Sequence, residues 1–279
     1  RTGQPGCVCR SSGPGSARPP LTTGLEPPAE SPNPGHWLIP DLLDTQKLAA
    51  IKQKLLGHHG SHEQQPDHEA LLGIQADGQH LPALRFDDDV FEFLTDPSLV
   101  EAVKRVSGLN AIRPFQFNLL TKAPGGPGTP WHRDRDFLPI NSQSYTCWIP
   151  LDPVPDHCTL VYAEGTAKLP PEQSDVVGPH ALQQLLEKHG APIRALPAMH
   201  PGDVDIHQGH IWHYGPANTT RNWRQALGVA FVEDGTRLCL HPPGFAGPAG
   251  AQMRIQTLMT SFGKQTEGQI VTGPRHPRL

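Results

Sequence analysis

This 279-residue chain lacks several features that define large classes of protein. It has no run of about eighteen apolar residues, so we expect no transmembrane helix. It has 23 Lys and Arg against 27 Asp and Glu, and its net charge is -4. A broad nucleic-acid surface needs clustered basic residues, so no nucleic-acid partner is expected. The chain also lacks a heptad pattern and a long exposed apolar strand, and we therefore expect a monomer that acts on a small molecule.

Cysteine is also scarce. The five cysteines are Cys7, Cys9, Cys147, Cys158 and Cys239. Their number is odd and no two of them form a CxxC pair, so a disulfide framework is not predicted. Free thiols are typical of a reducing compartment, and we expect an intracellular protein, by default a cytoplasmic one.

The N-terminal segment has little that could fold. Residues 1–34 are rich in Gly, Pro and Ser, and no acidic residue precedes Glu26. Such a composition buries too little apolar surface to order the chain, which predicts a disordered leader. Arginines without acids also suit an organelle presequence, although helical amphipathicity is missing. We expect one catalytic domain over residues 35–240 and a C-terminal extension over residues 241–279, part of it disordered.

Helices are predicted on both sides of the catalytic core. The first should span residues 44–57, with Asp44 or Thr45 as its cap and a glycine at its end. Its apolar positions at helical spacing are Leu48, Ile51 and Leu55. A second helix is expected over residues 96–108, and a third over residues 251–263. A basic tail that we expect to be loose follows the third helix.

From Ile112 the pattern changes to short strands separated by turns. Strands are predicted at residues 112–121, 144–152, 158–165, 204–215 and 224–234. No βαβ crossover helices separate them, which indicates an antiparallel barrel or sandwich. Residues 166–200 interrupt the series and include a helix predicted at residues 179–190. A long insertion between barrel strands is typical of a lid or a substrate wall.

His132 and Asp134 form an HxD pair next to the first strands. On an extended backbone, residues two apart share a face, so both side chains could bind one metal. Sixteen histidines make one such pair expected by chance, and a surface ion pair in a loop is the alternative. Two imidazoles and one carboxylate can occupy one face of Fe(II) and leave positions open for a co-substrate and dioxygen.

The second histidine is expected in residues 204–215, where His207, His210 and His213 are all candidates. We favour His213 because a turn after it should form a hairpin that lays Arg224 alongside its strand. A buried guanidinium can bind a carboxylate through two hydrogen bonds, so Arg224 is predicted to bind a co-substrate. Arg221 competes for this role, and a salt bridge at the rim is the structural alternative.

Three further residues are candidates for contacts with the co-substrate. Trp148 lies on the strand predicted at residues 144–152, where ordinary core packing is an equal explanation. Gln116 and Asn118 share one face of the strand predicted at residues 112–121. They could equally be exposed polar residues at an edge.

The segments WHRDRDF, SYTCWIPLDPV, TLVYAEG and HPGDVDIHQGHIWHYGPANTTRNWRQAL occur in that order. Together they resemble the phytanoyl-CoA dioxygenase family of Fe(II)/2-oxoglutarate oxygenases, from about Gly35 to about Asp234. The resemblance implies a mainly β protein with flanking helices around a double-stranded β-helix, a jelly-roll core of cupin type. By position, the iron ligands would be His132, Asp134 and His213. Arg224 would bind the distal carboxylate of 2-oxoglutarate, and Trp148 would lie beside it.

The resemblance implies hydroxylation of an unactivated C–H bond in a small or lipid-like molecule. Dioxygen and 2-oxoglutarate would be consumed, succinate and CO2 released, and ascorbate could serve as a reductant. Related halogenating enzymes lack the carboxylate ligand, so Asp134 favours hydroxylation. His157, Cys158 and Gly165-Thr166-Ala167 depart from the family pattern, which affects the local loop and not the ligand set. The alternatives are a catalytically degenerate metal-binding protein of the same fold and a zinc hydrolase that uses His207, His210 and His213.

Overall fold

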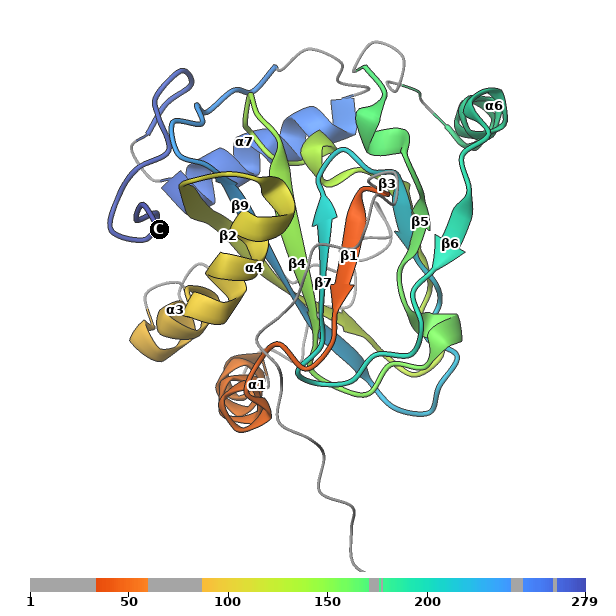
Figure 1. Ribbon diagram of the computed structural model, residues 1–279, viewed down its shortest axis with the longest axis horizontal. Coiled ribbons are helices and arrows are strands. Elements are labelled where there is room, and N and C mark those ends of the chain that lie inside the picture. Colours follow the sequence, from red (N-terminus) through yellow and green to blue (C-terminus); the bar gives the residue numbers. More distant parts are fainter. Residues whose placement is uncertain (1–33, 60–86, 171–175, 177, 242–247, 263–264) are drawn as a thin grey trace, which may run out of the picture. The chain divides into compact units, whose positions relative to one another are not determined.

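The structure is a computed structural model of the chain, shown in Figure 1. It describes residues 34–59, 87–170, 176, 178–241, 248–262 and 265–279. The chain divides into two units, Arg1–Ser31 and Pro32–Leu279, and every described residue belongs to the second. The predicted leader, apart from residue 34, and the first two cysteines therefore lie outside the described residues. None of the described helices is both long and apolar enough to cross a membrane.

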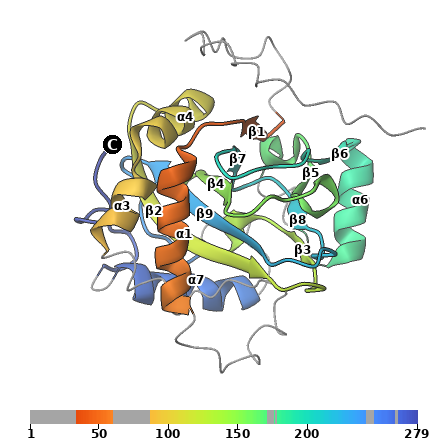
Figure 2. The same cartoon turned by 90° about the horizontal axis from the view of Figure 1, so that it is seen from below.

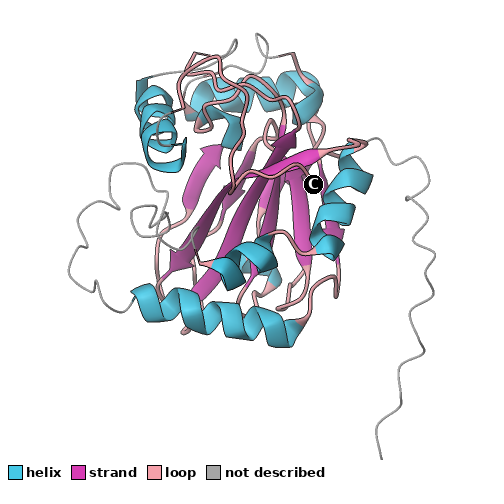
Figure 3. Ribbon diagram, turned by 90° about the vertical axis from the view of Figure 1, so that its left-hand side faces the viewer, coloured by secondary structure: helices cyan, strands magenta, loops and turns pink. Residues whose placement is uncertain are grey.

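Two antiparallel sheets form the core, and Figure 3 shows their strands in magenta. The larger sheet has the order β1 (His36–Ile39), β7 (Val204–Gln208), β4 (Ser144–Pro150), β9 (Arg224–Glu233) and β2 (Ile112–Lys122). The smaller sheet has the order β3 (Thr129–His132), β8 (His213–Gly215), β5 (Val161–Ala163) and β6 (Ile193–Ala195). This arrangement confirms the predicted mainly β, jelly-roll class.

The central strand β9 separates an apolar outer face from an inner face with small side chains. Its outward residues are Leu227, Val229 and Phe231, which are fully or almost fully buried. They pack in one apolar cluster with helices α1 (Thr45–His59), α3 (Asp88–Leu94) and α4 (Pro97–Ser107), which Figure 2 shows beside the sheet. Its inward residues include Ala226, Gly228 and Ala230. At Gly228 a β-carbon would lie 3.5 Å from the Leu120 side chain and 4.0 Å from that of Thr146.

The predicted helices form for the predicted reasons. Asp44 Oδ1 accepts hydrogen bonds from the first turn of α1, whose three apolar positions are all buried. The helix runs two residues beyond Gly57, to His59. Asp96 caps α4, and Gly108 ends it in the left-handed conformation with φ 73°. Helix α3, which begins after its cap Asp87, was not predicted.

The prediction of a single strand over residues 204–215 is wrong. It divides into β7 in the larger sheet and β8 in the smaller one. A turn separates them, in which Gly209 N donates to Ser144 O at 2.7 Å and Ile211 N donates to Gln208 O at 3.0 Å. His213 therefore begins β8 instead of ending a longer strand. The predicted hairpin is also wrong, because β9 pairs with β2 and β4 and not with β8.

Two helices and the C-terminal tail complete the fold. Helix α6 (Pro179–His189) forms within the 166–200 insertion as predicted, and Gly190 follows it in the left-handed conformation. Helix α7 (Pro248–Phe262) packs its last ring on Phe115 at a centroid distance of 4.8 Å. Ile112 and Leu279 exchange two backbone hydrogen bonds, so the last residues lie along β2. The sequence predicts a loose tail at this position, whereas these two hydrogen bonds join its last residue to β2.

Candidate active site

His132, Asp134 and His213 converge at one end of the two sheets. His132 ends β3, Asp134 begins the short 3-10 turn η2 (Asp134–Asp136), and His213 begins β8 next to β3. Asp134 Oδ1 lies 3.8 Å from His132 Nε2 and 3.6 Å from His213 Nε2. The three candidate ligand atoms all lie within 4.8 Å of one another. Among the described residues, this is the one group of three that could hold a metal ion.

Backbone carbonyls orient both imidazoles. His132 Nδ1 lies 2.8 Å from Pro130 O, and His213 Nδ1 lies 3.1 Å from Ile211 O. A carbonyl only accepts, so each Nδ1 carries the proton and each Nε2 keeps its lone pair for a metal. Burial, and then the neighbouring His132, lower the pKa of His213 to about 3. Both effects keep His213 neutral, as a metal ligand must be.

The second oxygen of Asp134 is held by two other side chains. Thr146 on β4 donates its hydroxyl to Asp134 Oδ2, and His207 Nε2 lies 3.1 Å from the same atom. Burial would raise the pKa of Asp134, but the hydrogen bond from His207 and the nearby imidazoles hold it well below its usual range. Asp134 is therefore an anion whose Oδ1 faces the two histidines.

His207 in turn rests on a second buried carboxylate. Its Nδ1 lies 3.1 Å from Asp205 Oδ2 and 3.0 Å from the hydroxyl oxygen of Tyr162, and the proton of that hydroxyl is donated to Asp205. Burial would lower the pKa of His207, but the two carboxylates raise it to about 9. Burial would raise the pKa of Asp205, but His207 and His36 lower it to about 2. His207 is thus an imidazolium between two anions.

The same interactions test the zinc-hydrolase alternative. A zinc ligand must be a neutral imidazole, and His207 is protonated at neutral pH. Burial, and then the charges of Arg135 and Arg133, lower the pKa of His210 to about 3, and this cationic surrounding disfavours a metal ion. Of the three histidines in that alternative, only His213 belongs to the converging group.

Arg224 begins β9 and is buried, with an exposed fraction of 7%. Its Nη1 donates to Cys158 O and, at 3.4 Å, to Pro216 O, in the segment that follows β8. Arg224 therefore reaches β8 across the gap between the sheets, and not along a shared hairpin. Its Cζ lies 5.9 Å from the ring of Trp148. The indole Nε1 of Trp148 is buried and has no hydrogen-bond partner among the described residues.

Lys122 belongs to the same neighbourhood, although nothing in the sequence analysis pointed to it. It lies opposite Arg224 in the register of β2 and β9. Its Nζ donates to Gly215 O at 2.8 Å and to Pro216 O at 2.9 Å. The pattern that could have revealed it is its even spacing from Gln116 and Asn118, which places all three on one face of β2.

Gln116 and Asn118 do lie on the inner face, opposite Ala230 and Gly228 of β9. Gln116 Nε2 donates to Asn118 Oδ1 at 3.1 Å. Gln116 Oε1 is buried without a hydrogen-bond partner in the described part of the chain. The pair therefore lies on the same face of the sheet as the small residues of β9. Arg221, the competitor of Arg224, is exposed.

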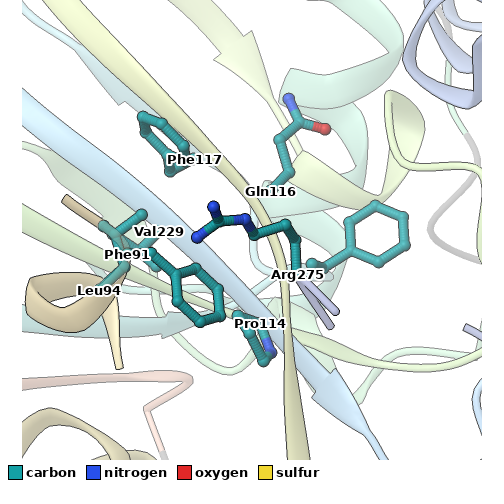
Figure 4. A pocket seen from close by; sticks show the side chains of 8 residues that line it. Phe91, Leu94, Pro114, Gln116, Phe117, Val229 and Arg275 are labelled. Carbon is teal, nitrogen blue, oxygen red and sulfur yellow. The ribbon is translucent and has the colours of Figure 1, made fainter. Parts of the chain in front are cut away.

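A separate small cavity lies by the helices (Figure 4). Its volume is about 20 Å³, enough for a water molecule only. It is lined by Phe91, Leu94, Pro114, Phe115, Gln116, Phe117, Val229 and Arg275. Phe117 and Val229 belong to the outward row of the sheet, so this cavity is not a candidate for substrate binding.

Comparisons with known proteins agree with this geometry. A family model described as phytanoyl-CoA dioxygenase (PhyH) matches residues 33–226, more than half of the chain. No curated protein matches the sequence significantly.

Solved structures with a similar fold include SnoN, SnoK and EctD. SnoN, described as a non-heme alpha ketoglutarate dependent epimerase from nogalamycin biosynthesis, is 20% identical, with a TM-score of 0.67 over 88% of this chain and 94% of its own. SnoK, a carbocyclase from the same biosynthesis, is 19% identical, with a TM-score of 0.66 over 88% and 92%. EctD from S. alaskensis, solved with 2-oxoglutarate and 5-hydroxyectoine, is 17% identical, with a TM-score of 0.55 over 77% of each chain. At such identities the likeness shows the fold.

Proposed function

We propose a role for each site residue, from the premise that this chain belongs to the phytanoyl-CoA dioxygenase family of Fe(II)/2-oxoglutarate-dependent oxygenases. The chain is an enzyme of that class, with iron as cofactor and 2-oxoglutarate as co-substrate. In our proposal His132, Asp134 and His213 hold the iron, and Arg224 binds the distal carboxylate of 2-oxoglutarate. One observation carries the proposal: two imidazole Nε2 atoms face one oxygen of a carboxylate whose other oxygen is already bound.

The residues fit the cofactor in number and in chemistry. Two neutral imidazoles and one carboxylate are the donor set of a facial Fe(II) site, which leaves positions open for other ligands. When iron and 2-oxoglutarate are bound, they supply the activation of dioxygen, and the co-substrate is converted to succinate and CO2. The protein fixes the ligands and keeps the reacting atoms away from water. Trp148 supplies an apolar wall beside Arg224, and Gln116 and Asn118 offer polar groups to a ligand above β9.

We propose that the reaction is hydroxylation of an unactivated C–H bond of a small or lipid-like substrate. One dioxygen atom would enter the product as hydroxyl and the other would enter succinate. The carboxylate ligand Asp134 supports hydroxylation over halogenation, because it fills the position that a halide needs. Epimerase and carbocyclase outcomes, named for SnoN and SnoK, are the competing results on this fold. A monomeric state and an intracellular location remain predictions from the sequence.

We propose that residues 166–200 form a wall of the substrate site within the catalytic domain of residues 35–240. Helix α6 of this insertion packs two leucines, Leu182 and Leu185, in a cluster with Trp212. Trp212 directly precedes the candidate ligand His213, so helix α6 packs next to the residue that begins β8. Mutations in this helix should change substrate preference more than iron affinity.

Succinate formation tests the proposed function. Protein purified without oxygen and loaded with Fe(II) should convert 2-oxoglutarate to succinate, faster when a suitable organic compound is added. Asp134→Ala should lose the activity and its bound iron. Asp156→Ala is the matched control, because Asp156 is exposed and lies outside the ligand set. Unchanged turnover in Asp134→Ala would contradict the assignment, and iron binding without any turnover would indicate the degenerate alternative.

A further inference from the structure

Two basic side chains are buried next to each other at the end of β2 and β9. Lys122 and Arg224 are directly opposite in the ladder, and their exposed fractions are 4% and 7%. Both cationic heads contact one carbonyl oxygen, that of Pro216, at 2.9 Å and 3.4 Å. Both also approach Gly215, where a β-carbon would lie 3.2 Å from Lys122 Nζ and 3.4 Å from Arg224 Nη2. The two heads therefore share one small space.

No carboxylate among the described residues balances these charges. In the described part of the chain, no carboxylate oxygen lies within salt-bridge distance of either head, and the acceptors recorded for them are backbone carbonyls. Burial, and then the charge of Arg224, lower the pKa of Lys122 to about 7, and burial lowers that of Arg224 to about 10. Buried like charges without a counterion are costly, so the pair is complete only with an anionic ligand.

A third donor at the same place also lacks an acceptor. Trp148 Nε1 is buried without a hydrogen-bond partner, and the Trp148 ring lies 5.9 Å from Arg224 Cζ. The hydrogen bonds of Arg224 come from Nη1, and those of Lys122 use two of its three ammonium protons. Donors from three side chains thus remain for a ligand with more than one acceptor.

We propose that Lys122 is a second cation for the distal carboxylate of 2-oxoglutarate, and that Lys122 and Arg224 together select a co-substrate with two carboxylates. This inference rests on the proposed function, because it takes 2-oxoglutarate as the ligand. A guanidinium offers a planar fork and an ammonium a point charge, so one carboxylate satisfies both. Lys122 thereby acts on binding and co-substrate choice, while the iron ligands act on the chemistry.

The competing explanation is that Lys122 only anchors the turn after β8. Its bonds to Gly215 O and Pro216 O do tie that turn to β2. A purely structural lysine would affect every 2-oxo acid equally, because its loss would displace the whole site. A lysine that binds the distal carboxylate would matter only for ligands that carry this group. A pair of ligands therefore separates the two roles.

The experiment compares 2-oxoglutarate with 2-oxopentanoate, which has the same five-carbon chain and the same chelating end but no distal carboxylate. Dissociation constants are measured by calorimetry without oxygen on the Fe(II)-loaded protein. Lys122→Met should weaken the binding of 2-oxoglutarate by about tenfold to a hundredfold, since a hydrogen bond to a charged group is lost. The affinity for 2-oxopentanoate should not change. Lys122→Arg should keep most of the preference, and the exposed Lys47→Met is the matched control.

Two results would overturn the inference: equal weakening of the binding of both ligands in Lys122→Met, or an unchanged affinity for both. If the wild-type protein binds neither ligand, the proposed function itself fails, which is a different outcome.

If Lys122→Met does not fold, a measurement on the wild-type protein tests the inference instead. The bound carboxylate favours charged Lys122, so the preference for 2-oxoglutarate should fall as pH rises above about 7. The charged and titratable groups facing Lys122 are the Arg224 guanidinium and the Cys158 thiol. Cys158→Ala keeps the backbone acceptor of Arg224 and should keep the pH dependence. A preference that is constant from pH 6 to pH 9 would rule the proposal out.

Discussion

The two ends of the site differ in how their charges are balanced. At the metal end, Asp134 and Asp205 enclose the His207 imidazolium, and hydrogen bonds connect all three. At the cationic end, Lys122 and Arg224 face backbone carbonyls and no carboxylate of the described chain. The metal end is thus organised before any ligand arrives, whereas the cationic end is completed by one. Changes at the metal end should lower stability and iron binding, and changes at the cationic end should mainly alter co-substrate affinity.

The largest effect is expected at His207. His207→Leu leaves the buried Asp205 and the partly buried Asp134 without their shared partner, and breaking a buried ion pair costs about 3–5 kcal/mol of unfolding free energy. Loss of the bond to Asp134 should also lower Fe(II) affinity by about tenfold to a hundredfold. Chemical denaturation and metal titration measure the two effects. His207→Gln keeps a hydrogen-bond donor and should lose less stability and less Fe(II) affinity. Equal losses in the two variants would contradict this account.

A second prediction concerns a mutation that changes the cationic end alone. Arg224→Met should weaken 2-oxoglutarate binding by about a hundredfold, because a charged hydrogen-bonding partner of the ligand is removed. The Fe(II) affinity should change little, since Arg224 has no bond to the metal end. Calorimetry with both ligands provides the measurement, and the exposed Arg221→Met is the matched control. A comparable loss in Arg221→Met would reassign the role to that residue.

A third prediction concerns the stability of the protein at low pH. Burial lowers the pKa of His213 and that of His210 to about 3, so each is neutral in the fold and protonated after unfolding below about pH 6.5. The unfolded chain then binds more protons, and stability falls as pH falls from 6.5 towards 3. Each histidine should contribute up to about 1.4 kcal/mol per pH unit in this window. Metal-free denaturation at pH 7.5 and pH 5 measures it, and His210→Asn should reduce the slope.

The smallest effect is expected at Gly215. In Gly215→Ala, the new β-carbon would lie 3.2 Å from Lys122 Nζ and 3.4 Å from Arg224 Nη2, and both are ends of flexible side chains that can shift. Stability should change by less than about 1 kcal/mol, while 2-oxoglutarate affinity should fall by a few fold because two donors are displaced. The Fe(II) affinity serves as the internal control. A fall in both affinities would show that the mutation disturbs β8 as a whole.

Local patterns predicted the elements whose causes are local. The helices α1 and α4 follow from apolar spacing and from the caps Asp44 and Asp96. The strands β2 and β9 follow from alternation, because one face of each is buried in the apolar cluster with the helices. Helix α3 is only seven residues long, and too short for a helical period to be recognised. The C-terminal tail has a basic sequence, and its position follows from backbone hydrogen bonds to Ile112.

The candidate metal ligands were recognisable because their residue types are distinctive and two of them lie two positions apart in the chain. Their supporting residues were not. His207 was predicted only as a competing ligand, and nothing in the sequence singled out Asp205 or Lys122. Each obtains its role from a partner far away in sequence, such as Asp134 for His207 and Arg224 for Lys122.

The order of residues was thus sufficient for the fold class, for most helices and strands, and for the type of chemistry, because periodicity and donor type are properties of short segments. The assignment of β7 and β8 to different sheets, and the route by which Arg224 reaches the site, depended on packing. The charges of His207 and Lys122 depended on it too, since a pKa inside a protein is set by burial and by neighbours that the chain brings together only when it folds.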